Sequence, residues 1–373
     1  MDKFSDLVVI IGAGISGLSL GITLAKKNIR SIIFEKHNDI HELGAGISIS
    51  PNGINVLNEL DVTKSLISIS SNPKKVKLHS GDQIIKTLSV DVITTSRKSL
   101  YKVLYEKYSE LGGEIIFNRE VKDINYNENL IYTDEDTLQA KIICACNGIK
   151  SKIRDKFDKS TPEYSGYSVF RSILNKSQKN IEFYLAPGFH VVAYPVNENQ
   201  TSFVAAYKSK NKVIESWRKK SNIKELEKIV HKKIIERFYN LKKSDIYKWG
   251  VYLRPNITNL SYKNTFLLGD AAHPIVPFMG QGGCLALEDG YILGTLIDRY
   301  RNNIEKVSYF YNKSRIPRVK FVDKVSHMQG KLNHLENPHL INIRNFLLKN
   351  TNIAGYRNKI WDFNVNTDVN KYL

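Results

Sequence analysis

Three glycines near the start of the chain have the spacing of a turn that binds dinucleotide phosphates. Gly12, Gly14 and Gly17 form a GxGxxG pattern at the end of the apolar run LVVIIG. In such a pattern the first glycine makes a tight turn, the second lets the backbone approach a pyrophosphate, and the third lets a helix pack closely on the strand. Ser16, inside the same pattern, is a further candidate for this site.

An acidic residue follows at the distance that such a site requires. Glu35 ends an apolar stretch and stands 35 − 17 = 18 residues after the third glycine. A carboxylate about 20 residues after the turn accepts a hydrogen bond from an adenosine ribose hydroxyl. We therefore count Glu35 and its neighbour Lys36 among the cofactor-binding candidates. The expected elements are a strand over Leu7–Gly12, a helix over Ser16–Lys27 and a strand over Ser31–Glu35.

A second motif lies in the last third of the chain. The sequence LLGDAAHP, which contains Asp270, leads into IVPFMGQGG and then into a segment with helical spacing of its apolar residues. Together with the glycine turn, this motif resembles the class A flavoprotein monooxygenases, the aromatic hydroxylase family that includes salicylate-type hydroxylases and the flavin-dependent urate hydroxylase. The resemblance implies FAD as the bound cofactor.

The same resemblance implies roles for the residues of this motif. The carboxylate of Asp270 would accept hydrogen bonds from ribityl hydroxyls of FAD, and Pro277 would lie against the isoalloxazine ring. A helix that begins near Gly282 would direct its free N–H groups and positive dipole end at the pyrimidine edge of that ring. The cofactor-binding candidates from this motif are Asp270, Pro277, Gly280, Gln281, Gly282 and Gly283.

Other segments match the same family, so the resemblance covers most of the chain. Gly46 lies in the family's loop after the second strand, and Arg97 opens a helix where the family has an arginine that meets cofactor phosphate. The segment CACNGIKSKIR matches an Asp-Gly motif that the family uses for both flavin and nicotinamide nucleotide. Here Asn147, before Gly148, replaces the aspartate and removes a charge from the motif.

Strand-like runs in the middle of the chain predict an antiparallel meander. They cover Ile181–Ala186, Phe189–Tyr194 and Thr201–Tyr207. Alternation along the middle run places His190, Val192 and Tyr194 on one face. The resemblance implies that such a sheet roofs the flavin, with Arg171, His190, Tyr194 and Tyr207 as candidates to orient a phenol or a carboxylate. The candidates for catalysis are Pro277, His190 and Tyr194. Cross-strand packing is the alternative role for a histidine or tyrosine in a strand.

The predicted fold class is α/β, in a two-domain α+β form. A Rossmann-like FAD-binding domain with a parallel sheet is interleaved with an antiparallel substrate domain, and helices follow at the C-terminus. The FAD-binding domain is expected over 1–75, 96–165 and 259–300, the substrate domain over 76–95 and 166–258, and the C-terminal helices over 301–373. Residues 222–240 predict one charged amphipathic helix on the flank of the sheet, and Arg315–Arg318 (RIPR) match an R-x-P-R region of the family.

Composition limits the classes of partner. The chain carries 55 Lys and Arg against 37 Asp and Glu, a formal net charge of +18, but no long basic block or aromatic-interleaved patch. We therefore expect attraction to anionic groups and no nucleic-acid partner. The three cysteines form no CxxC pair and suit a reducing compartment, and no metal site is expected.

Two apolar segments raise the question of a membrane. Glycines interrupt the run Leu7–Ala25, and no basic stretch precedes it, so we expect neither a membrane span nor a signal peptide, and a cytoplasmic location. The C-terminal segment LINIRNFLLKN mixes apolar and basic residues. It could touch a membrane surface, although packing of a helix on the domain is the favoured interpretation.

The function implied is that of an FAD-dependent monooxygenase. NADPH or NADH would visit transiently and reduce the flavin, and a flavin hydroperoxide formed with O2 would hydroxylate a small aromatic or other electron-rich ring. The expected partners are an aromatic small molecule and O2, and the expected assembly is a monomer or a homodimer. Two alternatives remain: a reductase or dehydrogenase of the same fold that acts on a polyprenyl or quinone-type lipid, and a non-enzymatic flavin-binding redox protein.

Overall fold

One half of the molecule is built on a largely parallel sheet. The computed structural model describes residues 6–38, 45–214, 219–255, 258–351 and 354–373, and in this part of the chain the sheet has six strands in the order β18-β19-β11-β1-β2-β7. The strands are β18 (Ser261–Tyr262), β19 (Thr265–Leu267), β11 (Ile142–Ala145), β1 (Val8–Ile11), β2 (Ser31–Phe34) and β7 (Glu114–Ile116). All pairs are parallel except β18 with β19. The central strand β1 is buried along its whole length, as its apolar sequence predicts.

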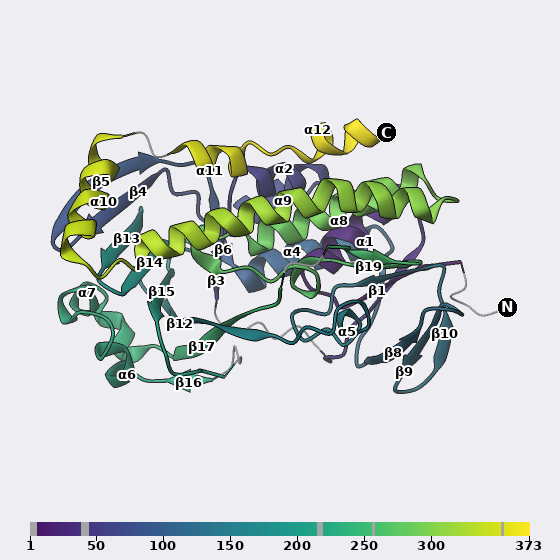
Figure 1. Cartoon of the computed structure of the whole chain (residues 1–373), viewed down its shortest axis with the longest axis horizontal. Coiled ribbons are helices and arrows are strands. Elements are labelled where there is room, and N and C mark those ends of the chain that lie inside the picture. The colour runs from purple at the N-terminus through teal and green to yellow at the C-terminus, as the bar shows by residue number, and fades with distance from the viewer. Residues whose placement is uncertain (1–5, 39–44, 215–218, 256–257, 352–353) are drawn as a thin grey trace.

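Helices cover this parallel sheet. Helix α1 (Ile15–Lys26) follows the glycine turn and packs on α8 (Gly282–Arg299), where Gly290 and Gly294 let the two backbones approach closely. Helix α4 (Arg97–Glu110) begins at Arg97, as expected, and packs on α1. The long helix α9 (Ile304–Asn333) runs from the parallel sheet to the opposite half of the molecule (Figure 1).

The other half of the molecule is built on a large mixed sheet. Among the described residues it has eight strands, in the order β16-β17-β12-β15-β14-β13-β4-β5. They are β16 (Lys220–Ser221), β17 (Ile246–Leu253), β12 (Glu163–Leu174), β15 (Thr201–Lys208), β14 (Phe189–Pro195), β13 (Ile181–Ala186), β4 (Lys75–Ser80) and β5 (Gln83–Ser89). The expected meander of β13, β14 and β15 is confirmed, and among the described strand pairs of this sheet only that of β13 and β4 is parallel. The α/β fold class with interleaved sheets is thereby confirmed.

The two faces of the large sheet have different partners. Phe189, Val191 and Ala193 of β14 lie in one apolar cluster with residues of the segment 222–243. The prediction of a single helix over 222–240 is wrong, because the segment forms α6 (Ile223–Glu227), α7 (Lys232–Arg237) and the 3-10 helix η1 (Tyr239–Lys243). The helical path breaks at His231, whose backbone is not helical. The opposite face of β14 looks toward the parallel sheet and its helices.

Smaller elements join the two halves. β3 (Gly46–Ile49) pairs antiparallel with β6 (Ile93–Ser96). The remaining elements before α8 are α2 (Pro51–Glu59), α3 (Thr63–Ile67), β8 (Val121–Asn125), β9 (Leu130–Thr133), β10 (Thr137–Gln139), α5 (Arg154–Phe157), η2 (Gly269–Ala271) and η3 (Pro277–Met279).

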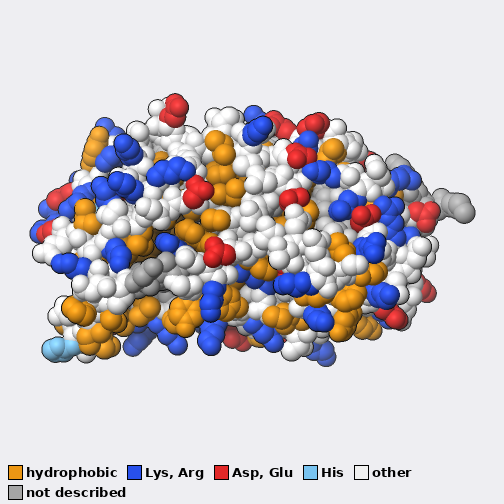
Figure 2. All heavy atoms as spheres, turned by 90° about the horizontal axis from the view of Figure 1, so that it is seen from above, with side chains coloured by type: hydrophobic (Ala, Val, Ile, Leu, Met, Phe, Trp, Pro, Cys, Tyr) orange, Lys and Arg blue, Asp and Glu red, His pale blue; other side chains and the backbone are white. Residues whose placement is uncertain are grey.

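The C-terminal region is helical, as predicted. After α9 come α10 (Pro338–Asn350), α11 (Ala354–Trp361), α12 (Val365–Val369) and η4 (Asn370–Tyr372). Ile360, Val365 and Val369 are buried, so this part of the region packs on the domain. Helix α10 instead exposes Ile343 and Phe346, at the end of the molecule where hydrophobic and basic side chains gather in Figure 2. In the described part of the chain, no helix has the length and apolar character that crossing a bilayer requires.

The close approach of α1 and α8 predicts a stability difference between two glycine substitutions. A methyl group on Gly290 would lie 2.6 Å from the backbone nitrogen of Leu20, whereas Gly355 in α11 has no other heavy atom of the described chain within 4 Å of that position. We expect Gly290→Ala to lower the free energy of unfolding by about 1–3 kcal/mol. Gly355→Ala should leave it unchanged or raise it by up to about 1 kcal/mol. Urea denaturation measures both, and equal effects would contradict the packing argument.

Candidate active site

The glycine turn between β1 and α1 has the shape that its sequence predicts. Gly12 has a φ of +103°, and a methyl group there would lie 2.7 Å from the carbonyl oxygen of Cys146. A methyl group on Gly17 would lie 2.1 Å from the carbonyl oxygen of Gly12. Gly14, by contrast, is exposed and has open space where a side chain would be. Gly12 and Gly17 are therefore needed for packing, while Gly14 leaves the turn accessible to a ligand.

The carboxylate of Glu35 lies directly at this turn. Its Oε2 accepts a hydrogen bond of 2.9 Å from the backbone N–H of Ala13, and its Oε1 accepts one of 3.0 Å from the N–H of His37. Lys36, beside it, is exposed. Because β1 and β2 are adjacent and parallel, their carboxyl ends place the acid next to the glycines, at the edge where α/β sheets bind ligands.

Asp270 lies on the same edge, after β19. Its side chain is exposed, yet desolvation by the surrounding protein raises its pKa, an effect that Arg97 and His273 oppose. Protein surrounds this carboxylate, yet solvent still reaches it. Asp270 therefore lines a recess that is open to solvent. Arg97 reaches this recess because α4 begins at that residue, where Ser96 caps the helix by accepting a 2.9 Å hydrogen bond from the N–H of Ser99.

The start of α8 presents free backbone donors to the same region. Among the described residues no side chain caps this helix, and its first turn holds no acid. Gly280 has a φ of +64°, and open space surrounds both Gly280 and Gly282. Gln281 is buried, whereas Pro277 is exposed. The uncapped N–H groups and the dipole of this helix favour a ligand with acceptor atoms and negative charge.

The segment after β11 contributes a buried hydrogen-bond acceptor, the side-chain oxygen of Asn147. Oδ1 of Asn147 is buried and, within the described part of the chain, has no hydrogen-bond partner. Gly148 follows with a φ of +77° and open space around it. A buried amide oxygen is an acceptor, so it suits a hydroxyl or N–H group of a ligand. With the open glycines, Asp270 and the uncapped start of α8, it forms a recess whose chemistry fits FAD.

One face of the large sheet turns toward this recess, as alternation along β14 predicts. His190 is paired across the strands with Ala206, Val192 with Val204, and Tyr194 with Ser202. A methyl group on Gly46 would lie only 2.7 Å from the hydroxyl of Tyr194, so the strand pair of β3 and β6 touches this face. Figure 1 shows β3 and β6 between the two halves of the molecule.

Arg171 belongs to the same face. On β12 it is paired with Val204 and with Tyr247 of β17. Its side chain is buried, with the guanidinium carbon 5.6 Å from the ring centre of Tyr247 and 5.0 Å from that of Trp249. The structure therefore brings Arg171 and Tyr194 to one surface, where both Arg97 and Arg171 act on the phenol of Tyr194.

Tyr207 does not join them, because it lies on the opposite face of the large sheet. It is the cross-strand partner of Phe189 and stacks on Phe170 at 5.5 Å, in the cluster that faces α6 and α7. Alternation is the reason: Tyr207 comes three positions after Val204 and one position after Ala206, and odd differences along a strand place side chains on opposite faces. The sequence does not identify the strand partner of Tyr207, and without that partner the face on which Tyr207 lies cannot be inferred.

His190 lies on the recess side but is enclosed by other rings. Its Nδ1 is 3.0 Å from Nε2 of His334, its ring stacks on Phe183 at 5.0 Å, and Phe278 packs against both histidines. Burial lowers the pKa of His190 well below its usual value, and His334 lowers it further. Burial also lowers the pKa of His334. The pair is therefore neutral in the folded protein at neutral pH.

The sequence alone does not predict the role of four charged residues near the recess. Glu288 and Asp289 of α8 are fully buried and pair with Arg315 and Arg318 of α9. The two arginines belong to the RIPR sequence, which matched the family without a role. Two adjacent acids in an otherwise apolar helical segment were the available signal, because such residues are rarely buried without partners.

The histidine pair predicts a loss of stability in mild acid. Both folded-state pKa values lie below the unfolded value of about 6.5, so the unfolded state binds more protons as the pH falls below that value. The free energy of unfolding should decrease between pH 6.5 and 5, by up to about 1.4 kcal/mol per pH unit for each histidine. His190→Gln, which does not titrate, should have a shallower slope in urea denaturation across this range. An unchanged slope would contradict the assignment.

The open space at Gly14 predicts a defect in cofactor binding alone. Gly14→Val meets no atom of the described chain within 4 Å at its Cβ and has an ordinary backbone φ of −73°, so the FAD-free protein should keep its melting temperature. The side chain would fill the space that the pyrophosphate needs, and we expect at least a tenfold weaker affinity for FAD, measured by fluorescence titration. Gly17→Ala is the contrast, because its clash should destabilise the fold itself. Normal FAD affinity in Gly14→Val would contradict this prediction.

Comparisons with known proteins agree with this geometry. A family model described as an FAD binding domain matches residues 6–321. The 3-hydroxybenzoate 6-hydroxylase of Klebsiella oxytoca is 24% identical to this chain over 380 residues, and the alignment covers 95% of each of the two chains. The crystal structure of CtdE with FAD and a substrate has a TM-score of 0.87 at 20% identity, covering 98% of this chain and 97% of that one. The salicylate hydroxylase substrate complex has a TM-score of 0.81 at 20% identity, covering 100% and 98%. Because the family model spans most of its length, the chain belongs to the FAD binding domain family, as a class A flavoprotein monooxygenase with FAD as its cofactor.

Proposed function

We propose that this protein hydroxylates a small aromatic substrate that carries a carboxylate, with electrons from NADPH or NADH and an oxygen atom from O2. The observation that carries this proposal is the buried Arg171, set between the rings of Tyr247 and Trp249 on the sheet face that turns toward the recess. A guanidinium pairs with a carboxylate in a planar, bidentate manner, and neighbouring rings favour an aromatic ligand. Two of the similar proteins, a hydroxybenzoate hydroxylase and a salicylate hydroxylase, are named for aromatic acids.

Tyr194 is the proposed partner of a substrate hydroxyl. Burial raises its pKa, while a hydrogen bond with Ser202 and the charges of Arg97 and Arg171 act in the opposite direction. The phenol therefore stays protonated at neutral pH and can donate a hydrogen bond. Orientation of the ring by Arg171 at one end and Tyr194 at the other would fix which carbon faces Pro277. Proximity and orientation of this kind account for much of an enzyme's rate enhancement.

The chain's own part in the reaction is binding, orientation and exclusion of water. Bound FAD would supply the electron transfer and the activation of O2, held by the turn at Gly14, by Glu35, Arg97 and Asp270, and by the start of α8. The dipole of α8 stabilises negative charge at its N-terminus. The rings of Phe278 and Trp249, in one apolar cluster of the large sheet, keep water from that side.

Asn147 bears on the use of nicotinamide nucleotide. The family's aspartate at this position is replaced by a neutral amide whose Oδ1 still offers an acceptor. We propose that the nicotinamide nucleotide visits this side of the recess and binds without help from a charge there. The net charge of +18 would aid the approach of both the nucleotide and an anionic substrate.

Anaerobic reduction of the bound flavin tests the proposed function. NADH and NADPH are added in turn, with 3-hydroxybenzoate, salicylate, uncharged phenols or a purine, and the visible absorbance is followed. We expect one aromatic acid to speed reduction at least tenfold and, after O2 is admitted, to gain one oxygen atom by mass spectrometry. A product without added oxygen would instead support the dehydrogenase alternative. Reduction that no compound accelerates would overturn the aromatic assignment.

The two faces of the large sheet predict different effects of substitutions at Arg171 and at Tyr207. Arg171→Met should raise the KM for the accelerating acid by about 10–100-fold, because a hydrogen-bonded charge contributes about 1.5–3 kcal/mol. Arg171→Lys should recover only part of the loss, because an ammonium lacks the bidentate geometry. Tyr207→Phe, on the opposite face, should leave KM within twofold. Steady-state kinetics measure all three, and equal KM values for Arg171→Met and Tyr207→Phe would exclude Arg171 from the substrate site.

A further inference from the structure

One carboxylate oxygen ties together both ends of the turn that carries Asp270. Oδ2 of Asp289 accepts a 2.8 Å hydrogen bond from the backbone N–H of Gly269 and a 2.6 Å hydrogen bond from Nε2 of His273. Within the turn, the carbonyl oxygen of Gly269 accepts hydrogen bonds from the N–H groups of Ala272 and His273. Asp270 lies between these anchored ends, so the position of its backbone depends on Asp289.

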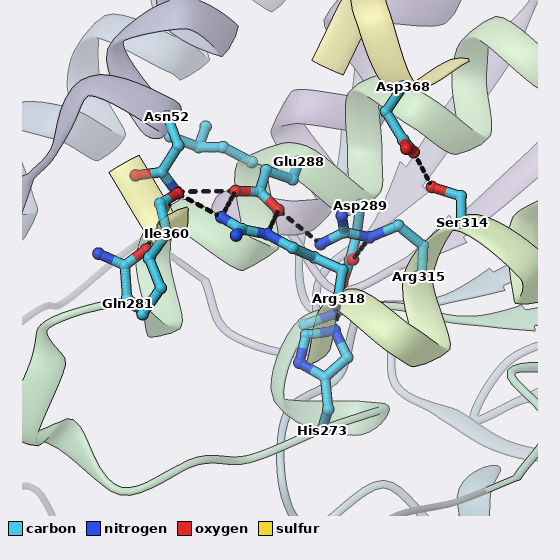
Figure 3. A network of polar contacts seen from close by, with 12 residues as sticks. Asn52, His273, Gln281, Glu288, Asp289, Ser314, Arg315, Arg318, Ile360 and Asp368 are labelled. Atoms are coloured by element: carbon cyan, nitrogen blue, oxygen red, sulfur yellow. Dashed lines mark hydrogen bonds and ion pairs between the residues drawn. The ribbon is translucent and has the colours of Figure 1, made fainter. Parts of the chain in front are cut away.

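Glu288, the residue before Asp289, is linked through the side-chain amide of Asn52 to the turn that precedes α8. Oε1 of Glu288 accepts a 2.7 Å hydrogen bond from Nδ2 of Asn52, and the same nitrogen donates a 3.0 Å bond to Oε1 of Gln281. Nε2 of Gln281 in turn donates to the hydroxyl of Ser50, at 2.9 Å. Figure 3 shows Asn52 between Glu288 and Gln281. Gln281 is the residue before α8, so Glu288 is linked to the start of that helix.

Two arginines of α9 neutralise the two acids (Figure 3). Nε of Arg315 donates to Oδ1 of Asp289 at 2.7 Å, and a terminal nitrogen of Arg315 lies 2.9 Å from Oε2 of Glu288. Arg318 forms a two-point contact with Glu288, at 3.1 and 2.8 Å. Both acids and Arg315 are fully buried. Burial opposes the charged forms, but Arg318 and Arg315 lower the pKa of Glu288, and His273 and Arg315 lower the pKa of Asp289.

Such a network needs a reason other than stability. Apolar residues of similar volume often stabilise a core as well as buried ion pairs do, or better, because they avoid the desolvation of charge. The hydrogen bonds that the two acids make beyond the arginines lead to the two turns that face the recess. Asp289 bonds to the turn that carries Asp270, and Glu288 is linked to the start of α8.

We propose that Asp289 and Glu288 are positioning residues for the cofactor: Asp289 sets the turn of Asp270, Glu288 sets the start of α8 through Asn52 and Gln281, and Arg315 and Arg318 serve as their counter-ions. The proposal rests on FAD binding and is independent of the substrate proposed above. It predicts that the two arms can be separated. Loss of the first arm should weaken FAD binding, and loss of the second should change the electrostatics around the flavin ring.

The first arm is tested with Asp289→Asn, which removes the charge at constant size. The purified holoenzyme is ultrafiltered at a series of concentrations, and the FAD retained gives the Kd. We expect the Kd to rise at least tenfold, with the midpoint potential of the flavin that remains bound unchanged. If this variant does not fold, His273→Phe removes one hydrogen bond to Asp289 and leaves Arg315 paired. It should raise the Kd at least threefold, again without a change in potential.

The second arm is tested with Asn52→Leu, which leaves the contacts between Glu288 and the two arginines in place. We expect the Kd for FAD to stay within threefold of the parent. The midpoint potential should become more negative and the visible absorption bands should shift, because a displaced helix start stabilises the reduced flavin less well. Spectroelectrochemical titration of the holoenzyme measures the potential.

Ser314→Ala is the matched control. Ser314 lies on α9 beside Arg315, and its buried hydroxyl donates to Oδ2 of Asp368 at 2.5 Å, away from both turns (Figure 3). This variant should lower the melting temperature without a change in Kd or potential. The proposal is overturned if Asp289→Asn or its substitute His273→Phe retains FAD as the parent does, if Asn52→Leu leaves the potential unchanged, or if both arms give the same pattern as the control.

Discussion

The ionised carboxylate of Asp289, held in the interior by Arg315, is the interaction on which the arrangement of the recess depends. It joins three separate elements: the turn after β19, helix α8 and helix α9. Because an unpaired buried charge is very costly, these elements must assemble together. The position of Asp270 is therefore a property of the whole helical layer and not of its own short turn.

The recess itself follows from how parallel strands end. β1, β2, β11 and β19 run in the same direction, so the segments that follow them gather at one edge of the sheet. Each of these segments brings a group of a different kind: open backbone at Gly14, a carboxylate at Glu35, an amide at Asn147 and an accessible carboxylate at Asp270. Helix starts at α1 and α8 add donors and positive dipole ends to the same edge.

The large sheet forms the opposite wall of the recess, and its two faces have different roles. The face with Phe189 and Tyr207 buries apolar area against α6 and α7, which anchors the sheet. The face with Arg171 and Tyr194 keeps polar groups near the recess, where burial strengthens their interactions with a bound ligand. The charges of Arg97 and Arg171 both act on Tyr194, so a residue of α4 and a residue of the large sheet influence the same phenol.

The sequence by itself determined the elements whose signals are local. The strand, glycine turn and helix from β1 to α1, the start of α4 at Arg97, the start of α8 at Gly282 and the alternation along β14 all follow from steric needs of neighbouring residues or from a period of two. Only the tertiary structure decided the rest. Tyr207 takes its face from its pairing with Phe189, and the helix expected over 222–240 breaks at His231, with apolar residues from both sides of the break packed on the large sheet. The pairing of Glu288 and Asp289 with the two arginines of α9 joins residues about 30 positions apart, and no local pattern encodes which buried charges will meet.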